Sequence, residues 1–267
     1  MFKESLKIKI IKKIFKKFKI DPLIFAYNQI GILNWENEYL SGEAYFVKEV
    51  LPEKISDLNN PVFFDVGANV GRYTESLLKT FNHAEVHSFE PLPSCVIKLN
   101  RLSDKYTERI VINDLCVSNE EGRFFINTYS NDLESEHASL YQDVLKTIHH
   151  SGEVRSIPVT ATTIDKYCEI HKIHKIDFLK IDTEGNEFKV LLGAKRMLSE
   201  KRISIIQFEF NEMNVISRTF FKDFFDLLID NYNLYRLHTN DLIPLREYDT
   251  SLEVFRFQNI IAFNKNF

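Results

Sequence analysis

Cysteine is scarce in this chain of 267 residues, and its three cysteines, Cys95, Cys116 and Cys168, form no closely spaced pair. A disulfide framework or a zinc site usually needs such pairs, so both are disfavoured and a reducing compartment is expected. Long apolar runs are also lacking: none approaches the length of a membrane span, and lysines interrupt every apolar stretch near the N-terminus. A signal peptide is therefore not expected, and the sequence favours a cytoplasmic protein.

An excess of basic charge is absent as well. The net charge is −4, from 34 Lys and Arg against 38 Asp and Glu, and this balance predicts no nucleic-acid partner. Apolar residues make up 44% of the chain and include 23 Phe but one Trp. The length and composition predict one α/β domain with a modest extension and a largely aromatic core.

The first twenty residues differ from this average, because they hold eight lysines and a single acid, Glu4. Their apolar residues recur every four positions, at Leu6, Ile10, Ile14 and Phe18, and are widened by Ile11 and Phe15. This pattern predicts a basic amphipathic helix. We favour a helix packed on the body with its lysines in water, and the alternative is an interfacial helix, a peripheral membrane contact attracted to anionic lipid.

From residue 62 short apolar runs alternate with helical patterns, after a helix expected over 34–50. The expected strands are 62–66, 85–90, 110–117, 177–182, 203–209, 232–237 and 259–263, and the expected helices are 72–81, 94–102, 187–199 and 219–230. This alternation predicts an α/β fold: a doubly wound, mostly parallel Rossmann-like sheet with an antiparallel last strand and an N-terminal helical extension. We assign residues 1–58 to the extension and 59–267 to a catalytic domain.

Residues 119–159 interrupt the alternation, because they are polar and irregular apart from a strand expected at 123–129. Long insertions in α/β domains are usually functional or mobile. We place a substrate lid here. His137 lies in this insertion and is a candidate base if the lid closes, although a loop histidine is more often solvated.

A glycine turn follows the first strand, with Asp65 before Gly67, Asn69 within the turn and Gly71 opening a helix. Such a turn lets the backbone approach a ligand and directs the helix's free N–H groups at an anion. The middle glycine of the dinucleotide pattern GxGxxG is missing. An acid ahead of the turn suits a ligand that carries its own cation, as the methionine ammonium of S-adenosylmethionine does.

Glu90 ends the next strand, 23 residues after Gly67. An acid at this place binds ribose hydroxyls in folds of this type, although the simpler interpretation is a solvated carboxylate at a strand end. Asn113 and Asp114, at the outer part of the third strand, are candidates to read the adenine edge, with Cys116 packed beside them. Together these positions predict an S-adenosylmethionine site.

A group of acids gathers where the fourth and fifth parallel strands are expected to end. Asp182 and Glu184 follow one strand and Glu209 ends the other, while Lys180 shares the face of Asp182. Converging carboxylates repel one another unless a proton or a cation relieves them, which leaves two sharp interpretations, a base with a raised pKa or a divalent ion held by oxygen ligands. We favour Asp182 or Glu184 as a base and assign no metal ligand. Structural ion pairs and a helix cap are the simpler alternative.

These motifs, taken in order, resemble the FkbM family of methyltransferases over roughly residues 60–265. The resemblance rests on three segments, Asp65-Val66-Gly67-Ala68-Asn69-Val70-Gly71, Phe89-Glu90-Pro91 and Lys180-Ile181-Asp182-Thr183-Glu184-Gly185-Asn186-Glu187, and on Asn113–Ser118 with Gly122 and on Gln207-Phe208-Glu209. It implies a class I fold and methyl transfer from S-adenosylmethionine, generally to a hydroxyl on a sugar, glycan or secondary metabolite. The alternatives are a nicotinamide-dependent oxidoreductase, which the missing glycine disfavours, and a non-catalytic cofactor-binding scaffold.

Overall fold

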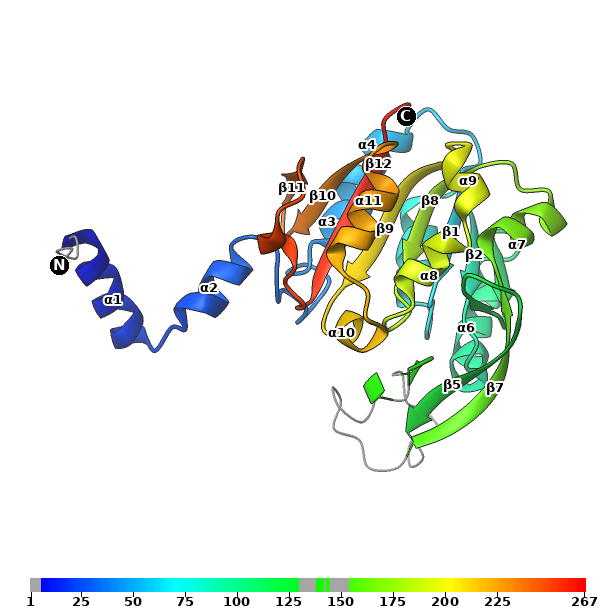
Figure 1. Cartoon of the computed structure of the whole chain (residues 1–267). Helices are drawn as coiled ribbons and strands as arrows, with labels where there is room; N and C mark the ends of the chain where they lie inside the picture. Colours follow the sequence, from blue (N-terminus) through cyan, green and yellow to red (C-terminus); the bar gives the residue numbers. More distant parts are fainter. Residues whose placement is uncertain (1–5, 130–137, 142, 145–153) are drawn as a thin grey trace.

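The computed structural model describes residues 6–129, 138–141, 143–144 and 154–267. Its main sheet has eight strands, which pair in both parallel and antiparallel directions (Figure 1). In spatial order they are β11 (Asp241–Leu245), β10 (Tyr232–His238), β12 (Gln258–Asn264), β9 (Ile203–Phe210), β8 (Ile176–Ile181), β1 (Val62–Val66), β2 (Glu85–Phe89) and β3 (Ile110–Asn113). The five strands from β9 to β3 are parallel, and β12, β10 and β11 each run antiparallel to the preceding neighbour.

This topology confirms the predicted fold class. The chain passes from β1 outward to β2 and β3, then returns to β8 on the other side of β1. The strand order therefore reverses between β1 and β8, and open α/β sheets bind ligands at the carboxyl ends of the strands that flank such a reversal.

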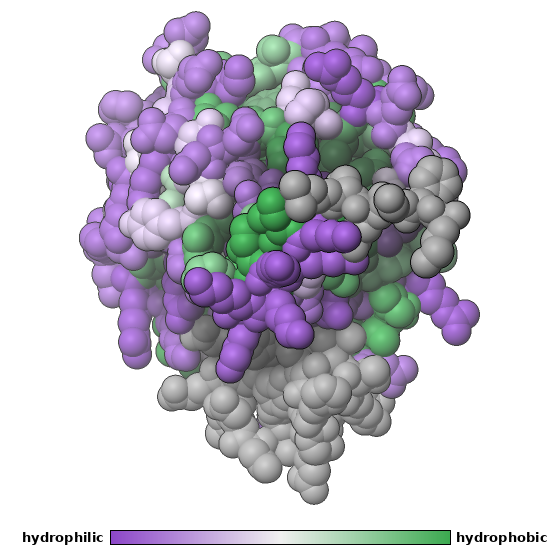
Figure 2. All heavy atoms as spheres, turned by 90° about the vertical axis from the view of Figure 1, so that its left-hand side faces the viewer, coloured by the Kyte–Doolittle hydropathy of each residue, from purple (hydrophilic) through white to green (hydrophobic). Residues whose placement is uncertain are grey.

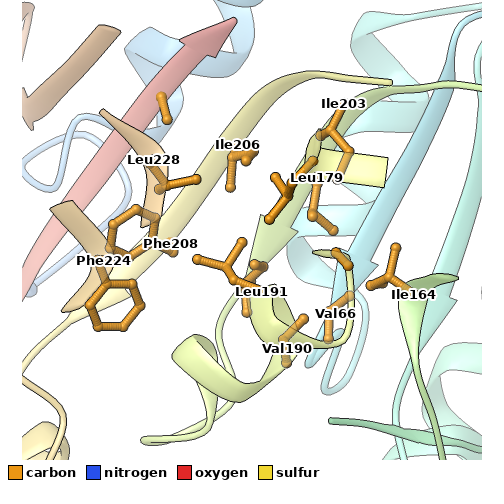
Figure 3. Close-up of a cluster of buried hydrophobic side chains, with 14 of the residues drawn as sticks. Val66, Ile164, Leu179, Val190, Leu191, Ile203, Ile206, Phe208, Phe224 and Leu228 are labelled. Atoms are coloured by element: carbon orange, nitrogen blue, oxygen red, sulfur yellow. The ribbon is translucent and has the colours of Figure 1, made fainter. Parts of the chain in front are cut away.

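Helices cover both faces of the sheet. One face carries α3 (Glu43–Tyr45), a wider π turn η1 (Phe46–Val50), α4 (Leu51–Ile55) and α5 (Arg72–Thr80), and the other carries α7 (Ile164–His171), α8 (Glu187–Leu192), α9 (Lys195–Ser199) and α11 (Phe221–Leu228). Figure 3 shows the second layer, in which Val190 and Leu191 of α8 and Phe224 of α11 meet the sheet residues Leu179 and Phe208. Burial of these side chains stabilises the packing of the helices on the sheet, and this packing fixes the positions of the strand ends.

Four further helical segments connect or extend this body: α1 (Leu6–Phe18), α2 (Pro22–Asn28), α6 (Pro93–Lys105) and α10 (Met213–Ser217), with a 3-10 turn at Thr250–Leu252. Among the described residues no helix has both the length and the apolar character needed to cross a membrane.

Residues 43–55 pack inside the domain and are not part of a separate extension. Phe46 and Leu51 are fully buried against Phe63 and Phe178 of the sheet. The helix expected over 34–50 begins only at Glu43, since residues 29–42 form turns. Gly42 explains this difference: its φ is +84°, and a Cβ there would overlap the carbonyl oxygen of His238 on β10. The chain at Gly42 thus packs closely against a strand nearly two hundred residues away. Local periodicity in the sequence does not reveal such a contact.

Two expected elements are divided in the structure. The strand predicted at 110–117 ends at Asn113, and Cys116–Val117 form β4 in a second sheet. The helix predicted at 187–199 breaks at Gly193 into α8 and α9, because the Asp165 carboxylate accepts hydrogen bonds from the backbone N–H groups of Arg196 (2.8 Å) and Met197 (3.0 Å) and so caps a new helix.

The second sheet is built from the region expected to be irregular. Its order is β4 (Cys116–Val117), β7 (Val154–Thr162), β5 (Gly122–Tyr129) and β6 (Ala138–Ser139). The strand expected at 123–129 is confirmed as part of β5, but β7 and α7 were not predicted. Ile126 and Val159 of this sheet pack with Leu92 and Cys95 near α6. The predicted lid therefore contains a folded β-sheet that is joined to the body by an apolar contact.

Candidate functional site

A cavity of about 310 Å³ lies at the carboxyl ends of β1, β2 and β8. Most of its wall comes from four places in the chain, namely the turn after β1, the residues after β2, the segment after β8, and the second sheet, and the starts of α3 and α5 complete it. The wall residues used below are Gly67, Asn69, Glu90, Cys116, Ile126, Leu140, Lys180, Asp182, Glu184 and Asn186, together with Glu43 and Tyr73. Its volume is within the range of small-molecule sites, and its position is the strand-order reversal described above.

The glycine turn forms one side of this cavity. Gly67 has a φ of +81°, and a Cβ there would overlap the carbonyl oxygen of Asp182, so only glycine fits. Its N–H and that of Ala68 each donate a 3.0 Å hydrogen bond to the Phe89 carbonyl oxygen. Gly71, with φ +86°, begins α5, and a Cβ there would come within 2.6 Å of Leu99 and of Leu102. The two glycines thus allow β1 to approach β8 and α5 to approach α6.

Glu90 is held facing the cavity by the backbone on both sides of it. Its Oε2 accepts from the Asn69 N–H at 2.9 Å and its Oε1 from the Leu92 N–H at 2.8 Å. Burial raises the pKa of Glu90 to about 7, although these two hydrogen bonds oppose the rise. Each carboxylate oxygen keeps a further acceptor position. The residue expected to bind ribose therefore lies in the cavity wall with capacity for two donors.

Asp65 lies behind the wall and not in it. Its side chain is fully buried, and its Oδ2 accepts a 2.6 Å hydrogen bond from Thr74 Oγ1. Its Oδ1 accepts no hydrogen bond from the described residues and lies 3.8 Å from Lys180 Nζ. Burial raises the pKa of Asp65, while the Lys180 ammonium opposes that rise. This acid therefore supports the turn and the lysine from the floor of the site.

Lys180 sits among three acids. Its Nζ donates a 3.1 Å hydrogen bond to Asp182 Oδ2 and lies 4.8 Å from the centre of the Tyr73 ring. Burial lowers the pKa of Lys180, but the carboxylates of Asp182, Asp65 and Glu43 outweigh burial and raise it overall. The lysine consequently stays charged and fixes the orientation of the Asp182 carboxylate at the cavity.

The acids of β8 and β9 converge as expected. Burial raises the pKa of Glu209 well above its ordinary value, and the neighbouring Asp182 and Glu184 raise it further. Glu209 is hydrogen-bonded to Asp182 and accepts from Asn211 Nδ2 at 2.9 Å. The raised pKa favours the protonated form of Glu209, in which it no longer repels the neighbouring carboxylates. Over the residues that the structure describes, no three Asp, Glu, His or Cys side chains are arranged to hold a metal ion.

Glu43 is a cavity residue that the sequence patterns missed. It begins α3, and its Oε1 accepts a 3.1 Å hydrogen bond from Gln207 Nε2 of β9. Burial raises the pKa of Glu43, the Lys180 ammonium lowers it and the Asp182 carboxylate raises it. Nothing in the surrounding helix-like pattern marked this acid, since it reaches the site only through the packing of residues 43–55 on the sheet.

Asn186 is a second missed residue. Its side chain is 1% exposed and lines the cavity, and its Nδ2 donates to the Val117 carbonyl oxygen at 3.0 Å. Its Oδ1 accepts no hydrogen bond from the described residues. A buried acceptor without a donor is costly, so a ligand with an N–H or O–H group fits this wall.

The candidate Asn113 and the neighbouring acid Glu187 make hydrogen bonds within the scaffold. The Asn113 side chain donates to the Ser88 carbonyl oxygen (3.2 Å) and accepts from Tyr167 (3.1 Å), which joins β3 to β2 and α7 outside the cavity. Glu187 closes the turn after β8, because its Oε1 accepts from the N–H groups of Thr183 (2.8 Å) and Gly185 (3.1 Å). The adenine role expected for Asn113 is not supported by this geometry, and Asp114 is also absent from the cavity wall, whereas Cys116 lines it.

The insertion predicted to be a lid reaches the site through β6. Ser139 Oγ donates a 2.7 Å hydrogen bond to the Glu184 carbonyl oxygen, and Leu140 and Ile126 line the cavity. His137, the candidate base of the lid, lies outside the described residues.

Comparison with known proteins accounts for this arrangement. The model of the methyltransferase FkbM domain matches residues 65–237, from the acid before the turn to the end of β10. The chain belongs to the FkbM methyltransferase domain family. This confirms the resemblance inferred from the motifs, and membership in this family implies S-adenosylmethionine as the methyl donor.

Two curated relatives are similar over part of their length. The chain is 22% identical over 160 residues to the 2-O-methyltransferase NoeI of Sinorhizobium fredii. The aligned region covers 58% of this chain and 65% of that protein. It is 24% identical over 173 residues to the hexuronic acid methyltransferase AglP of Haloferax volcanii, which covers 65% of each. The chain thus spans about two thirds, at 65%, of the length of these relatives.

Among solved structures, the precorrin-6y C5,15-methyltransferase of Geobacter metallireducens aligns with 82% of this chain and 87% of its own, at 9% identity and a TM-score of 0.42.

Proposed function

We propose that this protein transfers the methyl group of S-adenosylmethionine to a hydroxyl oxygen of a sugar or glycan. One observation carries the proposal: a single cavity brings together the glycine turn, Glu90 and the Lys180–Asp182 pair. The names of the two relatives, a 2-O-methyltransferase and a hexuronic acid methyltransferase, support the class of acceptor.

The cavity wall fits the cofactor. Glu90 has acceptor positions for two ribose hydroxyls, and Asn186 Oδ1 is a buried acceptor that lacks a donor. The turn from Gly67 to Gly71 brings backbone close to the ligand and faces it with the start of α5. Asp65 does not line the cavity, so in this proposal it acts indirectly, through its contacts with Thr74 and Lys180. When bound, S-adenosylmethionine supplies a methyl carbon made electrophilic by the positive sulfur.

The acceptor half of the cavity contains Asp182, Glu184 and Glu43. A hydroxyl is a weak nucleophile, so a base must take its proton as the new carbon–oxygen bond forms. Asp182 is the base in this proposal: Lys180 orients its carboxylate, and the raised pKa of Glu209 favours a protonated neighbour that hydrogen-bonds to it. Glu184 and Glu43 are placed to accept hydrogen bonds from neighbouring hydroxyls of the acceptor. Alignment of acceptor and methyl group then supplies much of the rate increase.

The test is the substitution Asp182→Asn, which keeps the shape of the side chain and removes its basicity. We expect S-adenosylhomocysteine to bind within a fewfold of the original affinity by isothermal titration. Methyl transfer to hexuronic acid glycans should fall by about 100-fold or more. Asp114→Asn is the matched control, because that exposed acid lies at the end of β3 outside the cavity. Full turnover by the Asp182 variant, or tighter binding of NAD than of S-adenosylhomocysteine, would overturn the proposal.

A further inference from the structure

The first two helices form a projecting arm, defined here as residues 6–28, that packs little against the body. Figure 1 shows α1 and α2 standing away from the sheet on the side of β10 and β11. No residue of α2 is buried, and residues 7–18 of α1 are exposed except for partial burial of Phe15. The expectation that the basic helix packs on the body is therefore wrong.

The arm leaves an apolar stripe in solvent. Five large apolar side chains of α1 are between 45% and 63% exposed, namely Ile8, Ile10, Ile11, Ile14 and Phe18. Helix α2 adds Leu23, Ile24 and Phe25 at 44% to 58%. The rings of Phe15 and Phe25, 5.5 Å apart, join the two helices. Contiguous exposed apolar surface on this scale marks a site of interaction.

The charge of the arm identifies its partner. Helix α1 has six lysines and no acid, whereas the whole chain has a net charge of −4, so the rest of the chain is more negative than that. At 3.6 residues per turn, Lys9, Lys12, Lys13 and Lys16 fall opposite the apolar stripe, Lys17 lies at its border, and Lys7 falls within it at the start of the helix. Figure 2, which views this end of the molecule, shows a green apolar patch beside long purple side chains.

A surface that is apolar on one side and basic on the other is complementary to an anionic bilayer. The stripe enters the boundary between headgroups and acyl chains, and the lysines meet the negative headgroups. Asp21 caps α2 by accepting from the Leu23 N–H at 2.8 Å, and Pro22 begins that helix, so the bend between the helices is built into the sequence. We propose that the arm binds the surface of an anionic membrane and tethers the domain there. This inference does not rest on the proposed chemistry.

Co-sedimentation with vesicles tests it. The full-length chain should bind phosphatidylcholine vesicles that contain phosphatidylglycerol, should bind pure phosphatidylcholine vesicles at least about tenfold more weakly, and should lose binding as salt rises. Two variants separate the two sides of the arm: Ile10→Ser with Ile14→Ser, and Lys9, Lys12, Lys13 and Lys16 each changed to Gln. Each should lower binding by about tenfold or more.

Matched controls carry the same substitutions elsewhere. Ile97 and Ile170 are 63% and 60% exposed on other helices, and Lys172, Lys195, Lys201 and Lys222 are exposed on the body. Changing these to Ser and Gln should leave binding unchanged. In a Trp35→Phe background, Phe18→Trp should give blue-shifted emission with anionic vesicles, which reports insertion of the stripe.

Three results would overturn the proposal. Equal binding to both kinds of vesicle removes the role of charge. Undiminished binding by the Ile10 and Ile14 variant shows that the lysines alone adsorb to the vesicles. Lysines alone would also bind a nucleic acid, and if RNA then competes with the vesicles, RNA is the partner. A dimer in light scattering that the same isoleucine substitutions dissociate shows that a second copy of the chain covers the stripe.

Discussion

At the scale of single residues, the raised pKa of Glu90 predicts that ligand binding depends on pH. Its pKa is raised to about 7 by burial, so a sizeable fraction is protonated just below neutrality. Hydroxyl groups of a ribose donate more strongly to the ionised carboxylate than to the neutral acid. If Glu90 binds the ribose as proposed, binding removes its proton, and the affinity should rise as the pH rises through about 7.

We expect S-adenosylhomocysteine to bind up to about tenfold more weakly for each pH unit below 7, with protons released on binding. Titration calorimetry in buffers of different ionisation enthalpy measures that release. Glu90→Gln should bind weakly, with no release and little pH dependence, whereas Glu85→Gln, at the start of the same strand, should behave as the unaltered protein. Unchanged proton release in the Glu90 variant would assign the titration to another group.

Glu43 makes a separate prediction about the acceptor. Glu43→Gln keeps the contact with Gln207 but removes a charge near Lys180 and Asp182. We expect kcat/KM for the acceptor to fall by about tenfold, consistent with the loss of a hydrogen bond to a charged group, while cofactor affinity stays the same. Glu49→Gln, an exposed acid of the same segment, is the control. A loss of cofactor affinity equal to the loss of kcat/KM would place Glu43 in the cofactor half.

At the scale of elements, we expect the turn between β1 and α5 to affect both stability and ligand binding. Gly67→Ala places a Cβ against the Asp182 carbonyl oxygen and requires a left-handed φ. We expect the free energy of unfolding to fall by at least about 2 kcal/mol and binding of S-adenosylhomocysteine to be lost. Chemical denaturation and calorimetry measure the two effects.

Gly122→Ala is the matched control for that substitution. Gly122 also has a positive φ, of +145°, but a Cβ there would meet only Phe124 at 4.0 Å. The Gly122→Ala variant should be destabilised through backbone strain alone and should still bind S-adenosylhomocysteine. If both variants retain binding equally, close approach of β1 to the residues after β8 is unnecessary for the site.

Elements whose cause is local were predictable from the sequence. The apolar run of β1, the glycine spacing after it and the alternation of strand and helix each reflect contacts between neighbours in the chain, and the structure confirms them. The missed features depend on distant partners. β7 is a strand because it pairs with β5 across the insertion, and Glu43 reaches the cavity because residues 43–55 pack on β8 and β9. The roles of the individual site residues remain predictions.

At the scale of the whole molecule, the arm is separable from the fold. Since α1 buries almost nothing, deletion of residues 1–20 should leave the melting temperature within about 1 °C of the full-length value, because stability follows buried apolar surface. The truncated chain should keep its turnover with a water-soluble acceptor and lose vesicle binding. Calorimetry measures the melting temperature, and a marked fall would show that the arm packs on the body in solution.

The position of Glu43 has a consequence for exchanging parts between related proteins. The family match begins at residue 65, yet one wall of the cavity is contributed from upstream of it. In the proposed site, part of the acceptor half therefore lies upstream of the family match, whereas the glycine turn and Glu90 lie within it. A chimaera that receives residues 29–58 from a relative should acquire part of that relative's preference among acceptors while its own glycine turn and Glu90 continue to hold the methyl donor.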